Sequence, residues 1–385
     1  MHYFLLSGEA SGDLHGSRLI EALRQLDKEA VFTFLGGDKM ARAAGCAPIV
    51  HYRDMAFMGF VEVLKNIRKV GANLRTARES LRMAKPDCLI LIDYPSFNLK
   101  VAATAHSEGI PVYYYISPKI WAWKKWRIRD IRRLVRRMYS ILPFEPEFYR
   151  QNGFRSEYVG NPSVEEVDQR MAHAVSRADF LAQYKLRDRP LVALMPGSRK
   201  AEIHNNLAVM NLALSEFPQY RGVIIGAPGI DDALYKACGA GNIPVIRPES
   251  AVDVLVHCRA ALVTSGTATL ETALAGVPQV VLYRGNGTKL TYDIMKRVLD
   301  IDYVSLPNLI VGREIIPEML QHLCSPAPVA DRLGPLLRTD SPVRQAQLDG
   351  YADMRRILGI KKAASTAADS IYRDLSELMT RAQSR

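Results

Sequence analysis

The chain begins with HYFLLSGEASGDLHGS at residues 2–17, a short apolar run followed by a glycine-rich turn. Short β-branched or aromatic runs then alternate with longer segments of helical period, which is the pattern of parallel α/β sheets. The predicted strands form two sets, residues 2–7, 31–36, 88–93, 112–117 and 139–144, then residues 191–196, 222–227, 244–248, 260–265 and 279–284. Two sets predict two sheets.

The length of 385 residues suits two domains, each with its own core. A polar segment without a strand pattern separates the two sets, so we place the boundary near residue 165 and expect domains of residues 1–165 and 166–359. The end of the chain predicts two helices separated by Gly359. The second helix is amphipathic and needs a partner face on one of the domains. Its apolar residues are Ile360, Ala364, Ala367, Ile371, Leu375 and Leu378.

The composition narrows the class of protein. With 48% hydrophobic and 24% charged residues, the chain is typical of a soluble globular protein. No apolar run approaches the roughly 18 to 20 residues that span a bilayer, and the first residues lack the features of a signal peptide, so we expect a cytoplasmic protein. The net charge of +11 favours an anionic partner, whether nucleic acid, acidic lipid or a phosphorylated substrate. Five scattered cysteines without CxxC spacing indicate reduced thiols.

The segment MPGSRKAEI, residues 195–203, follows a predicted strand and begins a helix. Free N–H groups and the helix dipole favour a phosphate near Ser198. Arg199 can add a permanently charged, bidentate contact. The alternative is an ordinary turn with a surface arginine.

A second candidate phosphate site lies in VTSGTATLETALAGVP, residues 263–278. Ser265, Gly266 and Thr267 begin a helix, and Glu271 lies one turn further along the same face as Thr267. This arrangement offers donors to a diphosphate and a carboxylate to two ribose hydroxyls. The alternative is a helix cap followed by an acid that stabilises the helix start.

Two other stretches of the second half contain polar residues of interest. The apolar loop of residues 303–314 contains Asn308, whose amide suits a nucleobase edge, although the loop could equally be a packing lid. Asp300, Ile301 and Asp302 have the spacing of a metal-binding DxD motif, but they follow a predicted helix instead of a strand. We therefore expect no metal.

In the first half, CLILIDYPSFNLK at residues 88–100 places Asp93 at the carboxyl end of a central strand. A carboxylate there is suited to accept a proton from a substrate hydroxyl, and partial burial would raise its pKa. The more common role of such an aspartate is to cap the following helix. We expect Asn98 to hold either this carboxylate or a sugar hydroxyl.

The opening turn carries Glu9 and Asp13, which would repel a pyrophosphate, and its glycine spacing is not GxGxxG. Carboxylates suit sugar hydroxyls, and the glycines would let the helix approach a bulky ligand. Ser11 is a candidate phosphate contact. His15 is an alternative acid or base, although a single helical histidine is more often structural.

Residues 116–138 contain all three tryptophans, and residues 124–137 carry eight basic side chains against one acidic side chain. Tryptophan, lysine and arginine favour the headgroup zone of an anionic membrane. The residues proposed for lipid contact are Met55, Phe57, Met58, Phe60, Trp121, Trp123, Lys124, Lys125, Trp126, Arg127 and Arg129. The alternatives are a helix with a solvated basic face and an RNA-binding surface.

Eight motifs occur in order along the chain: SGEASGD (7–13), MGFVEVL (58–64), IDYPSFN (92–98), SPKIWAW (117–123), LPFE (142–145), PGSR (196–199), SGTATLE (265–271) and DYVSLPNL (302–309). Together they resemble the lipid-A-disaccharide synthases, a family of bacterial inverting glycosyltransferases. The resemblance implies the GT-B fold, in which two Rossmann-like domains face each other across a cleft and a C-terminal helix, about 360–385, crosses back to the first domain.

The resemblance also implies an activity. The family transfers 2,3-diacylglucosamine from UDP to the 6-hydroxyl of 2,3-diacylglucosamine 1-phosphate. It needs no metal or organic cofactor. Because these substrates carry acyl chains, the resemblance implies peripheral contact with the inner membrane. It places the essential glutamate of the family on Glu9, the proposed catalytic aspartate on Asp93 and the diphosphate-contacting arginine on Arg199. Glu271 and Asn308 match positions expected to contact UDP.

One motif departs from the family pattern. Where members often read PSVWAW, this chain has Lys119 in place of the serine. The runner-up function is a UDP-N-acetylglucosamine 2-epimerase or an N-acetylglucosaminyl transferase of the same fold, but neither accounts for the basic, tryptophan-rich segment. An RNA-binding module is the alternative from another class, although a pure binder has no need of acids at strand ends.

Overall fold

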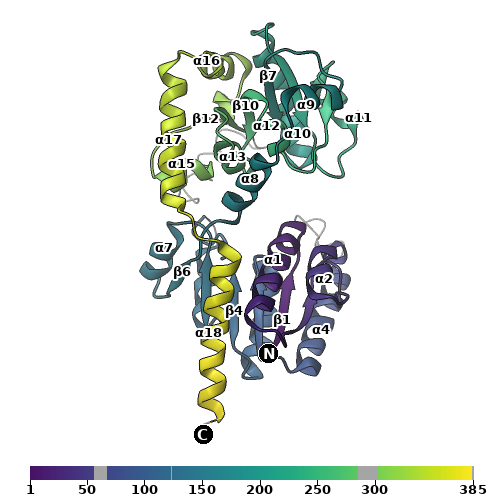
Figure 1. Ribbon diagram of the computed structural model, residues 1–385, viewed down its shortest axis with the longest axis vertical. Helices are drawn as coiled ribbons and strands as arrows, with labels where there is room; N and C mark the ends of the chain where they lie inside the picture. The colour runs from purple at the N-terminus through teal and green to yellow at the C-terminus, as the bar shows by residue number, and fades with distance from the viewer. Residues whose placement is uncertain (56–66, 123, 285–301, 384–385) are drawn as a thin grey trace. The chain divides into compact units, whose positions relative to one another are not determined.

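The computed structural model describes residues 1–55, 67–122, 124–284 and 302–383. The chain forms two compact units (Figure 1). Unit 1 comprises Met1–Pro162 and Ile360–Arg385, and unit 2 comprises Ser163–Gly359. The chain therefore leaves unit 1, forms unit 2 and returns to unit 1 for its last helix.

Unit 1 is built on one parallel sheet. Its strands are β1 (His2–Ser7), β2 (Val31–Leu35), β3 (Cys88–Ile92), β4 (Val112–Tyr115), β5 (Arg137–Ser140) and β6 (Ser156–Tyr158). Their order is β2-β1-β3-β4-β5-β6, and every neighbouring pair is parallel. Because the central strands are covered on both faces, they are continuous apolar runs instead of alternating ones.

Helices cover both faces of this sheet. One face packs against α1 (Ala10–Leu26) and α18 (Ala363–Gln383), which lie side by side in Figure 1. The other face packs against α4 (Ile67–Ala84), α5 (Pro95–Ser107) and α6 (Ile128–Leu134). The other helical segments described in unit 1 are α2 (Asp38–Ala44), η1 (Tyr52–Asp54), η2 (Lys125–Arg127) and α7 (Glu145–Gln151).

Unit 2 repeats the architecture. Its strands are β7 (Leu191–Met195), β8 (Arg221–Ile225), β9 (Val245–Ile246), β10 (Cys258–Thr264), β11 (Gln279–Tyr283) and β12 (Glu318–Leu320). The sheet is parallel throughout, in the order β12-β11-β10-β7-β8-β9. Two parallel six-stranded sheets, each with helices, confirm the predicted α/β fold of two Rossmann-like domains.

The helices described in unit 2 vary widely in length. They are α8 (Pro162–Ala172), α9 (Arg177–Gln183), α10 (Lys200–Ser215), α11 (Asp232–Tyr235), α12 (Val252–Leu255), α13 (Thr267–Leu274), α15 (Leu306–Val311), α16 (Pro326–Leu337) and α17 (Pro342–Leu358), with short turns η3 (Lys236–Ala240) and η4 (Gln321–Leu323). The expected boundary near residue 165 lies within α8. Side chains of α10 and α16 share one core cluster with β7, and α9 packs in a second cluster.

The last helix is anchored to unit 1 by apolar packing and by charge. Ala367 and Ile371 of α18 are fully buried in the same core cluster as β1 and α1. Asp374, 3% exposed, accepts hydrogen bonds from Arg136 (2.6 Å) and Tyr113 (2.7 Å) and lies 2.8 Å from an Nη2 of Arg137. The predicted apolar pattern of this helix was wrong at Ile360, which precedes the helix and is 97% exposed. Ala363 and Ala368 are buried there instead of Ala364.

Both sheets have a point at which the order of connection reverses. In unit 1 this switch lies between β1 and β3, and in unit 2 it lies between β7 and β10. In doubly wound sheets, ligands bind outside the carboxyl ends of the strands at such switch points. The loops that follow these four strands are therefore the loops in which to look for a site.

Candidate active site

Glu9 and Asp93 follow the two strands at the switch point of unit 1. Ser7 at the end of β1 pairs with Ile92 at the end of β3, so both acids leave the same edge of the sheet. Glu9 is the N-cap residue of α1. Burial raises the pKa of the neighbouring Tyr94, and the Glu9 charge raises it further. The structure therefore brings together the two acids that the sequence singled out.

Asp93 lies in a strained turn that the fold holds in place. Asp93 and Tyr94 have φ angles of 43° and 47°, in a region that is uncommon for residues other than glycine. The hydroxyl of Tyr114 donates to the Asp93 carbonyl at 2.7 Å, and the Asp93 N–H donates to Tyr115 at 3.3 Å. Strain at a strand end, supported from a neighbouring strand, fixes the direction in which this side chain leaves the sheet.

The surroundings of Asp93 suit proton transfer. Burial raises the pKa of its carboxyl group, and the Lys119 ammonium lowers that pKa in the opposite sense. A carboxylate with a raised pKa is a stronger base than one in bulk water, whereas a nearby cation favours the ionised form. A raised pKa at this strand end is compatible with the proton-accepting role that the sequence predicts for Asp93.

Asn98 does not act as predicted. Its side chain is fully buried, and its amide nitrogen donates to the backbone carbonyls of Asp93 at 2.7 Å and Ile92 at 3.2 Å. We expected it to hold the Asp93 carboxylate or a sugar hydroxyl. Instead it stabilises the strained backbone, because the start of α5 brings it beneath the turn.

The glycines of the opening turn serve internal packing. A Cβ atom at Gly8 would lie 2.3 Å from the Tyr94 ring, and one at Gly12 would lie 2.4 Å from the Ser7 hydroxyl. The glycines therefore allow close packing within the protein itself, whereas we expected them to allow the close approach of a ligand. Ser11 lies exposed in the first turn of α1.

The other two polar residues of α1 have structural surroundings. Asp13 is 3% exposed and accepts hydrogen bonds from the N–H groups of Gly37 (2.7 Å), Lys39 (3.1 Å) and Met40 (3.1 Å), which caps α2. It is therefore occupied and not directed at a sugar. Burial, with nearby cations, lowers the pKa of His15 to about 4. That imidazole is neutral near pH 7.

In unit 2, the turn after β7 forms an anion-binding site, and the carboxylate of Glu202 occupies it. The N–H groups of Ser198 and Arg199 both donate to one oxygen of Glu202, at 3.0 and 3.2 Å, and the Arg199 guanidinium contacts its other oxygen at 3.2 Å. A side chain at Gly197, with φ of 120°, would clash with Glu202. The Ser198 and Arg199 donors that the sequence assigned to a phosphate thus bind a carboxylate in this structure.

The turn after β10 lies beside the turn after β7, because Val263 pairs with Met195. Ser265 donates through its hydroxyl to the Val304 carbonyl at 2.8 Å, while Gly266 and Thr267 are exposed at the start of α13. One turn further along, burial and then the Glu166 carboxylate raise the pKa of Glu271. The Ser265 hydroxyl is therefore engaged within the protein. The donors of this turn that are exposed to solvent belong to Gly266 and Thr267.

Asn308 was predicted wrongly. The segment around it forms the helix α15 instead of a loop, and its amide is 0% exposed. Its oxygen accepts from Ile315 (2.8 Å) and Ile316 (2.9 Å), and its nitrogen donates to Ile316 and Glu318 (both 2.9 Å). With these bonds made, the amide has no capacity left for a nucleobase. Sequence reasoning missed Glu318, which also accepts from Ser305 at 2.7 Å.

The residues expected to touch lipid separate into three groups. Met55 (2% exposed), Trp121 (8%) and Arg127 (7%) are buried, so their prediction as lipid contacts is corrected. Trp121 donates to Glu145 and Arg127 donates to Ser96, so each of these two buried side chains has a partner inside the protein. Phe57, Met58, Phe60 and Trp123 lie outside the described residues, as do Asp300 and Ile301 of the DxD sequence.

The third group remains at the surface. Trp126 is 63% exposed, Lys125 and Arg129 are exposed, and Lys124 is half-buried. The Arg127 guanidinium lies over the Trp126 ring, 5.6 Å from its centroid, at a distance that allows a cation–π interaction. Within the described residues, no helix combines the length and apolar character needed to cross a bilayer.

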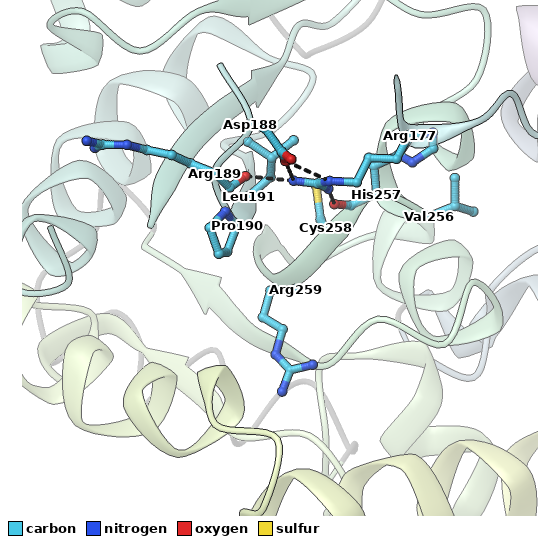
Figure 2. A pocket seen from close by; sticks show the side chains of 9 residues that line it. All are labelled: Arg177, Asp188, Arg189, Pro190, Leu191, Val256, His257, Cys258 and Arg259. Carbon is cyan, nitrogen blue, oxygen red and sulfur yellow. Dashed lines mark hydrogen bonds and ion pairs between the residues drawn. The ribbon is translucent and has the colours of Figure 1, made fainter. Parts of the chain in front are cut away.

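A separate hollow of about 600 Å³ lies at the opposite edge of the unit 2 sheet, where β7 and β10 begin (Figure 2). Arg177 is held there by Asp188 and by the carbonyls of Arg189 and His257. Arg259 points away from this group, toward Leu337 and Thr339. Because two of its arginines are engaged and the switch-point loops lie at the other edge, this hollow is not the candidate site.

Comparison with known proteins identifies close sequence relatives. A family model described as lipid-A-disaccharide synthetase matches residues 3–371. The lipid-A-disaccharide synthase of Myxococcus xanthus is 38% identical to this chain, over 95% of the chain and 96% of the relative. That of Acidobacterium capsulatum is 37% identical, over 94% and 93%.

Solved structures share the fold at low identity. A UDP-GlcNAc 2-epimerase from Neisseria meningitidis bound to UDP-GlcNAc aligns with a TM-score of 0.66 and 12% identity, covering 98% of this chain and 100% of its own. A glycotransferase of kitacinnamycin aligns with a TM-score of 0.59 and 14% identity, covering 97% and 98%. At these identities the likeness concerns architecture alone.

Proposed function

The chain belongs to the lipid-A-disaccharide synthase family and is a glycosyltransferase, and we propose that it joins two acylated glucosamines. The donor is UDP-2,3-diacylglucosamine and the acceptor is 2,3-diacylglucosamine 1-phosphate. The products are UDP and a β-1,6-linked disaccharide 1-phosphate. Family membership supports the synthesis of the lipid A disaccharide, and the exact substrates and the inversion at the anomeric carbon are our proposal.

In this mechanism Asp93 is the general base. Its carboxylate accepts the proton of the acceptor 6-hydroxyl as that oxygen attacks the anomeric carbon, and the bond from that carbon to the UDP oxygen breaks on the opposite side. Glu9, from the neighbouring strand end, positions the acceptor or the sugar by accepting hydrogen bonds from hydroxyls. The observation that carries the proposal is the pairing of β1 with β3, which puts both acids at one switch point.

The diphosphate is assigned to unit 2. We propose that it replaces the Glu202 carboxylate on the N–H groups of Ser198 and Arg199, with the Arg199 guanidinium neutralising charge that grows on the leaving UDP. The exposed start of α13 adds the donors of Gly266 and Thr267, and Glu271 accepts from the ribose hydroxyls. Asn308 is left out of this list because both ends of its amide are engaged. Asn98 is left out because its amide nitrogen donates to the backbone of the Asp93 turn.

The decisive test is product analysis with matched variants. Wild-type protein given both acylated substrates should yield the disaccharide 1-phosphate by mass spectrometry. Asp93→Asn should lose about 10²- to 10⁴-fold in turnover while UDP binding is retained. Glu21→Gln, an exposed acid of α1, is the control and should turn over normally.

Two results would contradict the proposal. Near-normal turnover of Asp93→Asn would remove Asp93 from the base role, and loss in Glu9→Gln alone would transfer that role to Glu9. A second candidate function comes from the fold likeness to the epimerase. If UDP-N-acetylglucosamine without acyl chains is epimerised or transferred, that alternative is favoured.

We also propose a peripheral position on the cytoplasmic side of the inner membrane. Exposed Lys125, Trp126 and Arg129 offer charge and an aromatic ring to anionic headgroups, for a substrate whose acyl chains reside in the bilayer. No nucleic acid partner, metal or organic cofactor is part of the proposal. Flotation with vesicles containing anionic lipid, in competition with RNA, distinguishes the two partners.

A further inference from the structure

Arg127, in the short turn η2 that follows β4, is a buried cation. The residue is 7% exposed, and its guanidinium donates to the Ser96 hydroxyl at 2.6 Å. Among the residues that the structure describes, no carboxylate forms an ion pair with it. A guanidinium is costly to bury unless an anion compensates its charge. The burial of Arg127 therefore calls for an anion from outside this part of the chain.

Neighbouring arginines of unit 1 have the usual acidic partners. Arg133 contacts Asp130 at 3.4 Å, and Arg136 donates to the buried Asp374 at 2.6 Å. Arg127 differs from both because its described hydrogen-bond partner is a neutral hydroxyl. A neutral oxygen satisfies one N–H group of the guanidinium but does not neutralise its charge. The charge of Arg127 is thus left for a ligand to compensate.

A second cation lies in the same turn. The backbone N–H of Arg127 donates to the Lys124 carbonyl at 3.0 Å, which closes the turn at the start of η2. Lys124 is half-buried, and burial and the Arg127 charge both lower the pKa of its ammonium group. Two cations in one turn repel each other, and an anion bound by both relieves that repulsion.

The Ser96 hydroxyl has a proton to donate. Its oxygen accepts from Arg127, and no described residue accepts its own proton. Ser96 is exposed and lies in the first turn of α5, where the helix dipole also favours a negative charge. A phosphate outside Ser96 can therefore accept hydrogen bonds from the hydroxyl and from the guanidinium behind it.

These donors lie at the edge of the sheet that carries Asp93. Strands β3 and β4 are parallel neighbours, so the turn after β3 and the loop after β4 leave the same edge. Ser96 follows Asp93 by three residues, a span of at most about 11 Å. A sugar phosphate held at Ser96 can therefore reach the proposed base with one of its hydroxyls.

We propose, on the basis of the function proposed above, that Arg127 and Ser96 bind the 1-phosphate of the acceptor sugar, with Lys124 adding positive charge. The phosphate and the 6-hydroxyl belong to the same sugar, so holding the first orients the second toward Asp93. The guanidinium then has the anionic partner that its burial requires. Arg127 thereby determines which acceptor is used, because a sugar without the phosphate leaves this buried charge uncompensated.

The experiment compares two acceptors, 2,3-diacylglucosamine with and without its 1-phosphate, in neutral detergent with the same UDP donor. For wild type, kcat/KM should be higher with the phosphate. Arg127→Gln should lose about 10- to 100-fold in kcat/KM with the phosphorylated acceptor and change little with the other, because it removes charge-assisted bonds to the phosphate alone. Arg127→Lys should fall between the two, since lysine keeps the charge but not the paired donors.

Two further variants keep the test independent of folding. Ser96→Ala alters an exposed residue and should lose about three- to fivefold with the phosphorylated acceptor alone. Arg132→Gln, which removes an exposed charge from α6, is the matched control and should behave like wild type with both acceptors. Thermal unfolding shows whether each variant is folded, and the KM for the UDP donor should stay constant throughout.

Equal losses with both acceptors, or an unchanged preference, in Arg127→Gln and Ser96→Ala would overturn the inference. So would a loss of flotation with anionic vesicles while the preference for the phosphorylated acceptor is kept, since the bound phosphate would then be a lipid headgroup. Failure of the proposed function gives a different result, because wild type then yields no disaccharide from either acceptor. A wild type that makes disaccharide equally well from both acceptors refutes the phosphate site alone.

Discussion

At the scale of single residues, Glu145 is a buried carboxyl group at the centre of a hydrogen-bond network. It accepts from Ser117, Trp121 and the Leu142 N–H, and these three bonds order the loop that carries Lys119. Burial nevertheless outweighs these bonds and raises the pKa to about 7. Between about pH 4.5 and pH 7, the folded protein therefore holds a proton on Glu145 that the unfolded chain has released.

This shift predicts a pH dependence of stability. Because the folded pKa is raised, the contribution of Glu145 is fully present below about pH 4.5 and is lost as the pH rises through about 7. The free energy of unfolding of wild type, relative to Glu145→Gln, should fall by about 2 kcal/mol between pH 5 and pH 8. Denaturant titration of both proteins at the two pH values measures it. A constant difference would show that this carboxyl group has an ordinary pKa.

Individual side chains were the least predictable part of the site. Glu9, Asp93 and Arg199 could be placed because strand ends and helix starts follow from the sequence pattern. Asn98 and Asn308 could not, since a buried amide that bonds the backbone has the same local sequence as one that binds a ligand. Their partners lie up to ten residues away or behind strained turns, which depend on tertiary packing.

At the scale of elements, the strands were predictable and their ends less so. Continuous apolar runs identify buried parallel strands, but β6 and β12 have three residues each, with sequences SEY and EML, and carry no such run. The strand β5 begins at Arg137, and this charged residue does not fit the apolar pattern by which buried strands are predicted. That charge is explained by Asp374 on α18, a partner more than two hundred residues away.

The Asp374 cluster fixes α18 to the sheet and gives a second stability prediction. Burial would raise its pKa, but the bonds from Arg136, Tyr113 and Arg137 together lower it to about 2. Asp374→Asn should destabilise unit 1 by about 2 kcal/mol, less than a fully buried pair because both arginines are partly exposed.

The matched control for Asp374→Asn is Glu377→Gln on the same helix. Glu377 forms an exposed ion pair with Arg381, at 3.7 Å, so its loss should change stability by less than about 0.5 kcal/mol. Thermal unfolding of the two variants and wild type measures the difference. Equal behaviour of both variants would mean that the buried cluster does not anchor the helix.

At the scale of the whole molecule, unit 1 is completed by a segment that follows unit 2 in sequence. Five side chains of that segment, Ala363, Ala367, Ala368, Ile371 and Leu375, are at most 2% exposed. A chain ending at Gly359 should therefore lose protection of residues 1–162 against proteolysis, while residues 163–359 stay protected. Mass spectrometry of limited digests identifies the surviving fragment. Protection of both regions would show that α18 is dispensable.

The return of the chain to unit 1 also has a consequence during synthesis. On the ribosome, residues 163–359 emerge as one continuous stretch and can fold as soon as they are free, whereas the earlier-made sheet must wait for the last helix. Until then, the apolar face that awaits α18 is open to solvent and to other nascent polypeptides. The part of the protein translated first is thus the part that matures last, and it is there that we expect a chaperone to be needed.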